Sequence, residues 1–134
     1  MVAFATPQEA ALAGDHISAE THVLAEAVGE DDAAVILMSP GWPQPDCVLC
    51  QRYEDGWVEG SSTSGQTIWP SRDDDNCLGL MVSWGRAQPG AAAVLVTFRG
   101  STVGIPVENG HYVWLVERVP MDAMDEPAEF HWLA

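Results

Sequence analysis

Hydrophobic and polar positions follow their clearest β pattern in residues 92–120. Val94, Val96 and Phe98 alternate with Leu, Thr and Arg, and such a mixture is typical of a strand that is covered on much of both faces. An Arg-Gly-Ser break ends this run, and a second β-branched run follows over residues 102–108. The pattern therefore predicts consecutive strands, but it indicates no catalytic or binding function.

An Asn109-Gly110 pair separates the second run from a third one. This dipeptide is the strongest short hairpin signal, because a type I′ turn needs positive φ at both central residues. Pro106 cannot donate to a β ladder, so we expect its run near a sheet edge. The turn predicts three cross-strand pairs, which are Glu108 with His111, Val107 with Tyr112, and Ile105 with Trp114.

A short helix is predicted at the N-terminal end, over residues 7–13. Thr6 can accept hydrogen bonds as the N-cap, Pro7 suits the first helical position, and Glu9 completes a capping box. Gly14 is a natural C-terminal stop. Because the helix has only about two turns, it must dock on the rest of the chain.

Residues 17–28 fit two patterns, since their apolar positions match both a helical stripe and a strand. We predict a strand for residues 20–28, folded as a hairpin onto the buried run 33–39. A Pro-rich loop is expected at 39–46, and further strands are expected at 47–53 and 77–84. The remaining expectations are a turn into 57–59, a flexible loop at 60–65 (GSSTSG), an edge piece at 68–70, an acidic loop at 71–76 and a docked C-terminal segment.

About eight short strands with Gly, Pro and Asp turns predict a mainly β fold. We expect an antiparallel β-sandwich or barrel with one short N-terminal helix, formed by residues 1–134 as a single domain. The alternative is an α+β fold in which the helix lies across a curved antiparallel sheet.

The charge balance is strongly acidic, because 20 Asp and Glu residues face five Arg residues and no Lys, with a net charge of −15. Such a chain repels nucleic-acid phosphates and anionic membrane surfaces. The absence of Lys also excludes a Schiff-base lysine and the lysine of a phosphate-binding P-loop. Without a leader-like N-terminus, we expect a cytoplasmic protein, although a mature secreted domain would have the same composition.

The motifs that could carry chemistry each have a simpler structural interpretation. Cys47 and Cys50 have CxxC spacing, but Val and Leu separate them within a strand-like run, so the sulfurs should point to opposite faces. The cluster Asp73-Asp74-Asp75-Asn76 departs from a calcium-binding loop. We predict no catalytic, cofactor-binding or metal-binding residues, and Cys77 is left free to pair with Cys47, with Cys50 or with neither.

Six Trp residues are many for this length. Trp84 and Trp114 lie on predicted strands and should be core residues. Trp42, Trp57 and Trp69 lie in or beside loops, so we predict that they mark a binding surface if they gather at one cleft.

Residues 52–57 (RYEDGW) and 84–86 (WGR), with the later hairpin, resemble small uncharacterised β-rich proteins of GC-rich bacteria. The resemblance covers about residues 33–120 and implies no activity and no site residue.

The leading hypothesis is a non-catalytic interaction module that binds a basic protein partner. The alternative is a small-ligand-binding protein or enzyme that uses a Trp-lined cavity in a curved sheet. A metal site on Cys47, Cys50 and a His ranks third, and homodimerisation stays open.

Overall fold

The computed structural model describes residues 2–14, 17–63, 67–70, 78–123 and 126–134. The described part contains a helix α1 (Pro7–Ala11), a short 3-10 helix η2 (Met121–Ala123) and ten strands. The strands are β1 (His22–Val28), β2 (Asp32–Met38), β3 (Asp46–Tyr53), β4 (Gly56–Thr63), β5 (Thr67–Pro70), β6 (Leu78–Arg86), β7 (Ala93–Phe98), β8 (Ser101–Pro106), β9 (His111–Pro120) and β10 (Glu129–Leu133).

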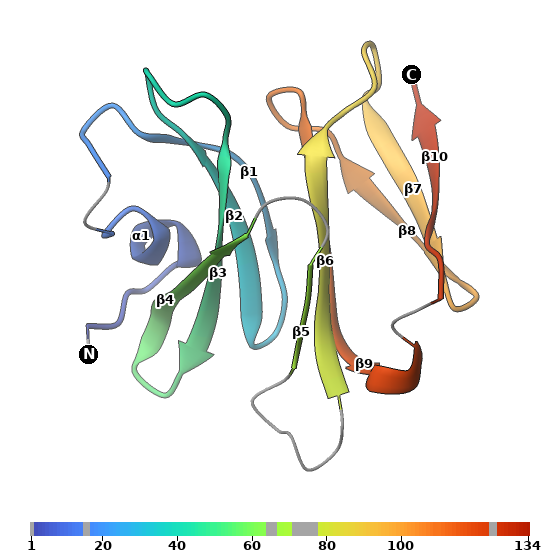
Figure 1. Cartoon of the computed structure of the whole chain (residues 1–134), viewed down its shortest axis with the longest axis horizontal. Coiled ribbons are helices and arrows are strands. Elements are labelled where there is room, and N and C mark those ends of the chain that lie inside the picture. The colour runs from blue at the N-terminus through green and yellow to red at the C-terminus, as the bar shows by residue number, and fades with distance from the viewer. Residues whose placement is uncertain (1, 15–16, 64–66, 71–77, 124–125) are drawn as a thin grey trace.

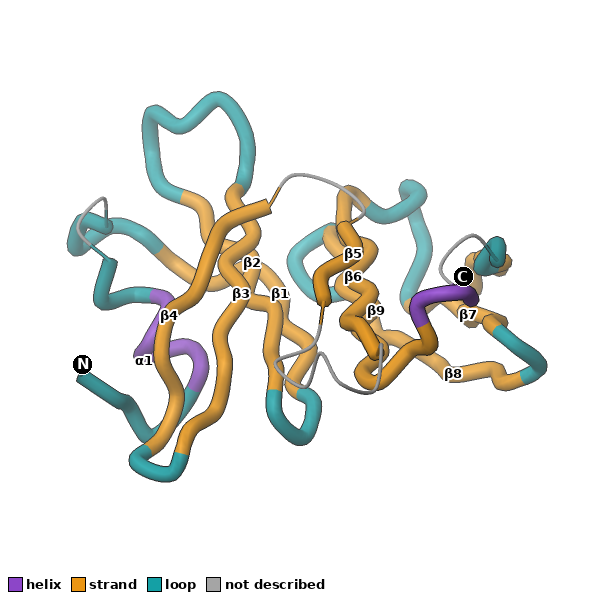
Figure 2. The backbone as a smooth tube through the Cα atoms, turned by 60° about the horizontal axis from the view of Figure 1, so that its bottom comes forward, coloured by secondary structure: helices purple, strands orange, loops and turns teal. Residues whose placement is uncertain are grey.

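The strands form three antiparallel sheets that stack as layers (Figures 1 and 2). The N-terminal sheet has the order β1-β2-β3-β4, the central sheet β5-β6-β9 and the C-terminal sheet β10-β7-β8. Helix α1 covers the outer face of the N-terminal sheet. The predicted mainly β, antiparallel, sandwich-like fold is confirmed, and the described strands do not close into a barrel.

Three hydrophobic clusters fill the spaces between the layers. In β2, Val35 and Leu37 pack toward α1, whereas Ile36 packs toward the central sheet. In β9, Val113 faces the N-terminal sheet and Trp114 faces the C-terminal sheet. Strands buried on both faces explain the nearly continuous apolar runs of the sequence, because period-2 alternation then places an apolar residue on each side.

Helix α1 begins at the predicted cap, but Glu9 closes it differently from a capping box, because its carboxylate accepts a hydrogen bond from the Thr6 hydroxyl at 3.1 Å. The Thr6 hydroxyl accepts a hydrogen bond from the Glu9 backbone N–H at 3.2 Å, and Pro7 occupies the first turn. The helix ends at Ala11, two residues before the predicted Ala13, because Leu12 is already the C-cap. Ala10 and Ala11 are fully buried, and their small side chains let the helix lie close to the sheet.

The region that fitted both helix and strand is a strand. Strand β1 pairs antiparallel with β2 in a hairpin, with Ala27 opposite Ala34 and Glu26 opposite Val35. The helical alternative for residues 17–28 is therefore wrong over β1. A bulge between Val23 and Ala25 shifts the register and interrupts the strict alternation of a strand, which is why the apolar positions of this segment also fit a helical stripe.

The turn at Asn109-Gly110 has the predicted geometry, but the pairing beyond it differs from the prediction. Both residues have positive φ, 50° and 77°, and Glu108 exchanges two backbone hydrogen bonds with His111, each 2.9 Å long. The strands then separate into different sheets. The predicted pairs Val107–Tyr112 and Ile105–Trp114 are wrong, because Ile105 pairs with Val94 and Trp114 pairs with Ser83.

A second turn with positive φ redirects β8. Arg99 and Gly100 have φ of 52° and 81°, and they fold β8 back onto β7 with Ser101 opposite Phe98. Strand β8 is consequently an edge strand, as Pro106 predicts. Of its inner residues, Ile105 packs against the cluster that contains Val94 and Trp114, whereas Val103, opposite Val96, stays exposed.

The GSSTSG segment is partly a strand instead of a loop. Strand β4 continues through Gly60 to Thr63, with Thr63 opposite Cys47. A β-carbon at position 60 would lie 3.0 Å from the Leu49 carbonyl oxygen, so the bulged register next to Cys50 favours Gly there. The rest of the predicted loop, residues 64–65, and the acidic loop with Asp73-Asp74-Asp75-Asn76 lie outside the described residues.

Candidate functional site

Of the three tryptophans that could mark a binding surface, the structure describes the side chains of Trp42 and Trp57, and both pack against the same core. Trp57 is only 7% exposed and packs in the core beneath α1, with the Arg52 guanidinium 5.8 Å from its ring centre. Trp42 is half-buried, packs against the same core and borders an open hollow of about 270 Å³ beside Pro43 and Pro45. Trp69 belongs to β5, and its backbone lies opposite Leu80 of β6. Its side chain lies outside the described part of the structure.

The CxxC pair does not form a redox or metal motif. Cys47 and Cys50 are free and buried, and they belong to different hydrophobic clusters on opposite faces of the N-terminal sheet. Burial raises the pKa of each thiol to about 12, with nearby carboxylates adding to the effect. Both are protonated at neutral pH, which makes them poor nucleophiles. Cys77 lies outside the described residues.

Metal-ligating residues do not converge in the part of the chain that the structure describes. No group of three or more His, Cys, Asp or Glu side chains could hold a metal ion there. His22 and His131 are exposed, and His111 lies at the turn where the sequence predicts it, with Nδ1 2.9 Å from the Asn109 carbonyl oxygen. His16 lies outside the described residues.

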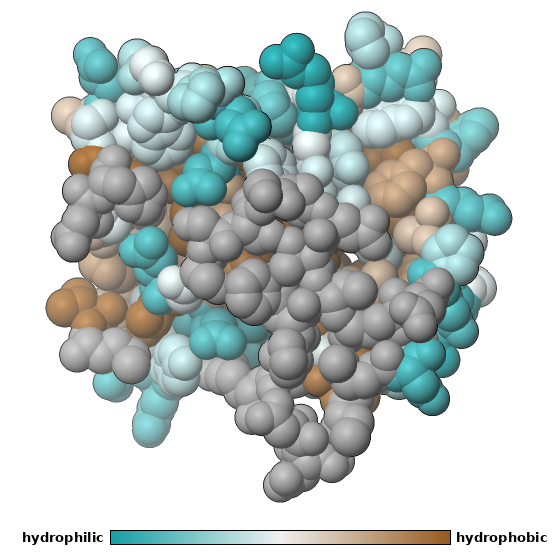
Figure 3. Space-filling model, in the orientation of Figure 1, coloured by the Kyte–Doolittle hydropathy of each residue, from teal (hydrophilic) through white to brown (hydrophobic). Residues whose placement is uncertain are grey.

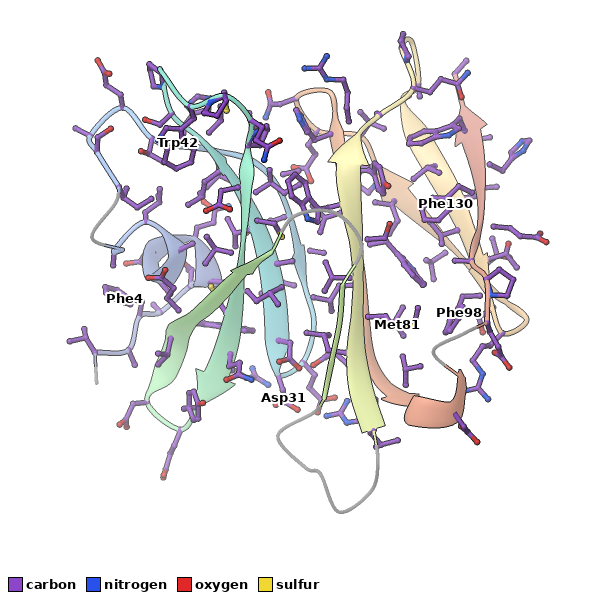
Figure 4. All side chains as sticks on the ribbon, viewed as in Figure 1. Phe4, Asp31, Trp42, Met81, Phe98 and Phe130 are labelled. Carbon is purple, nitrogen blue, oxygen red and sulfur yellow. The ribbon has the colours of Figure 1, made fainter. Side chains whose placement is uncertain are left out.

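One end of the molecule collects carboxylates from several turns (Figures 1 and 4). The β1–β2 turn, the β3–β4 turn and η2 all lie at this end, and Asp31 marks it in Figure 4. We call it the acidic end, and its exposed or half-buried acidic residues are Glu30, Asp31, Asp32, Glu54, Asp55 and Asp122.

The acidic end is joined to β9 by Glu117. Its carboxylate accepts backbone hydrogen bonds from the N–H groups of Glu30, Asp31 and Asp32, at 2.8 and 3.0 Å for the last two. Burial by itself would raise the pKa of Glu117, but these hydrogen bonds, and Arg118 nearby, lower it below the ordinary value. Glu117 is therefore ionised, and its carboxylate holds the β1–β2 turn against the central sheet.

Among the described residues, the arginines at this end are paired with carboxylates. Arg118, whose φ is 57°, contacts Asp31 at 2.7 Å and Glu30 at 3.2 Å. Arg99 contacts Glu126 at 3.3 Å, and Arg52 lies 3.9 Å from Asp31. The acidic end thus keeps an excess of negative charge.

An apolar cleft of about 260 Å³ opens beside the acidic end, between β9 and the C-terminal sheet. Its floor is formed by Val96, Phe98 and Trp114, and the two aromatic rings meet edge to face with centres 5.5 Å apart. Val103 of β8 lines one side and is 45% exposed. Arg99, Glu117 and Arg118 stand at its charged end, so the cleft joins apolar surface to the acidic end.

A second, shallower hollow of about 440 Å³ lies at the opposite end of the layers. The backbone of the β6–β7 loop forms much of it, with Arg86 and His111 at its border. Its lining combines the apolar Ala87, Pro89 and Val107 with the polar Gln88, Asn109 and His111, so it is more polar than the cleft, whose floor is Val96, Phe98 and Trp114.

Sequence reasoning missed Glu117, Arg118 and Val103 as surface-forming residues. Glu117 and Arg118 interrupt an otherwise apolar strand, and two adjacent charges in such a run are the signal that could have identified them. Nothing local marks Val103, because its exposure depends on how far β9 extends over β8.

Comparison with known proteins adds no assignment: no family model, no curated protein and no solved structure matches the chain. Among the described residues, no helix is long and apolar enough to cross a membrane. The hydrophilic side chains in Figure 3 occupy much of the outline of the face it shows, with hydrophobic residues visible at its left and right.

Proposed function

We propose that this protein is a non-catalytic interaction module whose acidic end binds a basic protein partner. The observation that carries the proposal is the unbalanced charge of that end. Its carboxylates come from separate turns, and the arginines that the structure describes there, Arg52, Arg99 and Arg118, are each paired with a carboxylate. A net charge of −15 adds a field that attracts basic surfaces and raises the rate of encounter with them.

The same field argues against other partners. Nucleic acids and anionic membranes would be repelled, because binding them would bring like charges together. We expect the protein to act in the cytoplasm, where basic protein partners are available. A second copy of the chain would also bring like charges together at the acidic end.

The test is salt-dependent capture. The full chain, immobilised, is exposed to a lysate, and bound proteins are identified at low and high salt. We expect basic proteins whose capture falls as salt rises, since surface charges are screened within about 10 Å at 0.1 M and about 3 Å at 1 M. Capture that is insensitive to salt, or that enriches acidic proteins, would contradict the proposal.

A matched pair of variants locates the interaction. The triple variant Glu54→Gln, Asp55→Asn, Asp122→Asn removes three charges from the acidic end. The control Glu20→Gln, Glu108→Gln, Glu129→Gln removes three exposed charges elsewhere. We expect association to slow by about tenfold for the first variant and by much less for the control, because local charge steers encounter. Equal effects would contradict a localised site.

The second candidate is a small-ligand-binding protein or enzyme that uses the cleft. In its favour, Trp114 and Phe98 form an apolar floor beside charged groups. Against it, about 260 Å³ is below the usual ~300–1,000 Å³ of ligand pockets. Its one carboxylate, Glu117, is held ionised by backbone hydrogen bonds, so it is unsuited to act as a general acid at neutral pH.

A further inference from the structure

We propose that the edge strand β8 receives an extended basic segment of the partner protein as an added strand, with an apolar side chain of that segment filling the cleft beside Val103. The inference rests on the proposed function and adds a mode of docking to it. Three features of the described residues carry it: an open strand edge, an apolar cleft on the inner face of that edge, and the surrounding charge.

Strand β8 is an unprotected edge. It lies at the end of the order β10-β7-β8, and five of its six residues are exposed. It carries no charged residue and its register with β7 is unbroken, so it lacks the charges and bulges that usually block edge pairing. Only Pro106 at its end limits the length that can pair. The backbone N–H and C=O groups of residues 101–105 that point away from β7 can therefore pair with another strand.

The inner face of β8 is incompletely covered. Val103 lies opposite Val96, whose side chain is 1% exposed, yet Val103 itself is 45% exposed. The difference arises because β9 covers β7 but leaves the neighbouring β8 beside the open cleft. A strand added next to β8 would extend this inner face by one more strand spacing, about 4.8 Å. Every second residue of that strand would face the cleft, over Trp114 and Val116.

The charge around the cleft determines which kind of added strand can bind beside β8. The charged groups in and beside the cleft have a net charge of −2. Two are positive and four are negative: Arg99, Glu117 and Arg118 line the cleft, and their partners are Glu126, Glu30 and Asp31. A second copy docking by its own β8 edge would bring another −15 against this face. A segment that alternates basic with apolar residues instead places its cations near the carboxylates and its apolar side chains in the cleft.

The experiment uses the full chain and three capped seven-residue peptides. The first alternates lysine with isoleucine, the second has the same composition with the isoleucines adjacent to one another, and the third alternates glutamate with isoleucine. Affinity is measured by titration, and amide hydrogen exchange is followed residue by residue. We expect the first peptide to bind at least about tenfold more tightly than the other two, with exchange slowed at the outward-facing amides of β8.

Two variants separate packing from charge. Val103→Lys puts a cation into the cleft, whereas Thr102→Lys puts the same charge on the outer face of the same strand, opposite Thr97. We expect the first to weaken binding of the alternating lysine peptide at least about tenfold and the second to leave it within about threefold. If Val103→Lys fails to fold, Val103→Ser compared with Thr102→Ser makes the same comparison without a charge.

Other outcomes would overturn the inference in distinguishable ways. No protection of β8, or protection only in the β1–β2 and β3–β4 turns, would show binding by charge alone and would leave the proposed function standing. If amide exchange in β8 becomes slower as the protein concentration rises, with no peptide present, the edge pairs with a second copy of the chain. Equal binding of the lysine and glutamate peptides would count against both the docking mode and the basic partner.

Discussion

Replacing Glu117 by Gln should destabilise the contact between the N-terminal and central sheets. The carboxylate receives three backbone hydrogen bonds, with Asp31 and Asp32 N–H groups on Oε2 and Glu30 N–H on Oε1. The oxygen of the introduced amide can keep the two bonds at the Oε2 position, but its NH₂ group would then face the Glu30 N–H without accepting a bond. The Glu117→Gln variant also loses the charge that attracts Arg118.

The magnitude follows from these contacts. A hydrogen bond to a charged group contributes about 1.5–3 kcal/mol, but Glu117 is only half-buried, so solvent screening reduces the value. We expect Glu117→Gln to lower the free energy of unfolding by about 1–2 kcal/mol at pH 7, measured by urea denaturation. Glu129→Gln, an exposed carboxylate on β10, is the matched control and should change stability by less than about 0.5 kcal/mol.

The pH dependence gives the sign of the effect. Because the folded-state pKa of Glu117 is lowered from its ordinary value of 4.5, its contribution is fully present above that value. It is lost as the pH falls through the lowered folded-state pKa, where the native carboxylate becomes protonated. The difference between wild type and Glu117→Gln should therefore shrink in acid. An equal difference at pH 7 and at strongly acidic pH, or none at pH 7, would refute an ionised carboxylate held by the turn.

Three further predictions concern local features. Thr6→Ala should lower stability by about 0.5–2 kcal/mol in denaturant melts through loss of the α1 cap, and an unchanged midpoint would mean that the cap contributes nothing. Gly110→Val should cost about 1–3 kcal/mol because φ is 77° there, and wild-type melting of this variant would contradict the turn. Asn109→Asp should also destabilise, since the Asn109 amide donates to the Leu24 carbonyl at 2.8 Å and Asp cannot; wild-type melting of this variant would show that this hydrogen bond contributes nothing. Cys47 and Cys50 should resist a thiol reagent at pH 8 until denaturant is added, because burial raises both pKa values to about 12, and rapid labelling of the native protein would disprove their burial.

Local features were determined by the sequence alone. The Thr6 cap, the type I′ turn at Asn109-Gly110 and the alternation in β7 each depend on residues within a few positions of one another. Their backbone conformation follows from side-chain hydrogen bonding and from which residues tolerate positive φ, whatever surrounds them. The absence of Lys and the net charge of −15 are equally visible without a structure.

The partners of the strands were decided only by the tertiary structure. A turn fixes one cross-strand pair, Glu108 with His111, but burial of whole faces decides that β8 continues with β7 and β9 with β6. Trp57 follows a turn that suggested exposure, yet α1 and Phe4 cover it from a distant part of the chain.

The candidate site also depends on tertiary structure more than on local sequence. Glu117 holds Glu30 from 87 positions away, and Val103 is exposed because another sheet stops short of it. The charge pair Glu117-Arg118 marks an unusual position in an apolar strand, but the sequence names neither its partner nor the exposure of Val103, because both depend on how separate sheets stack.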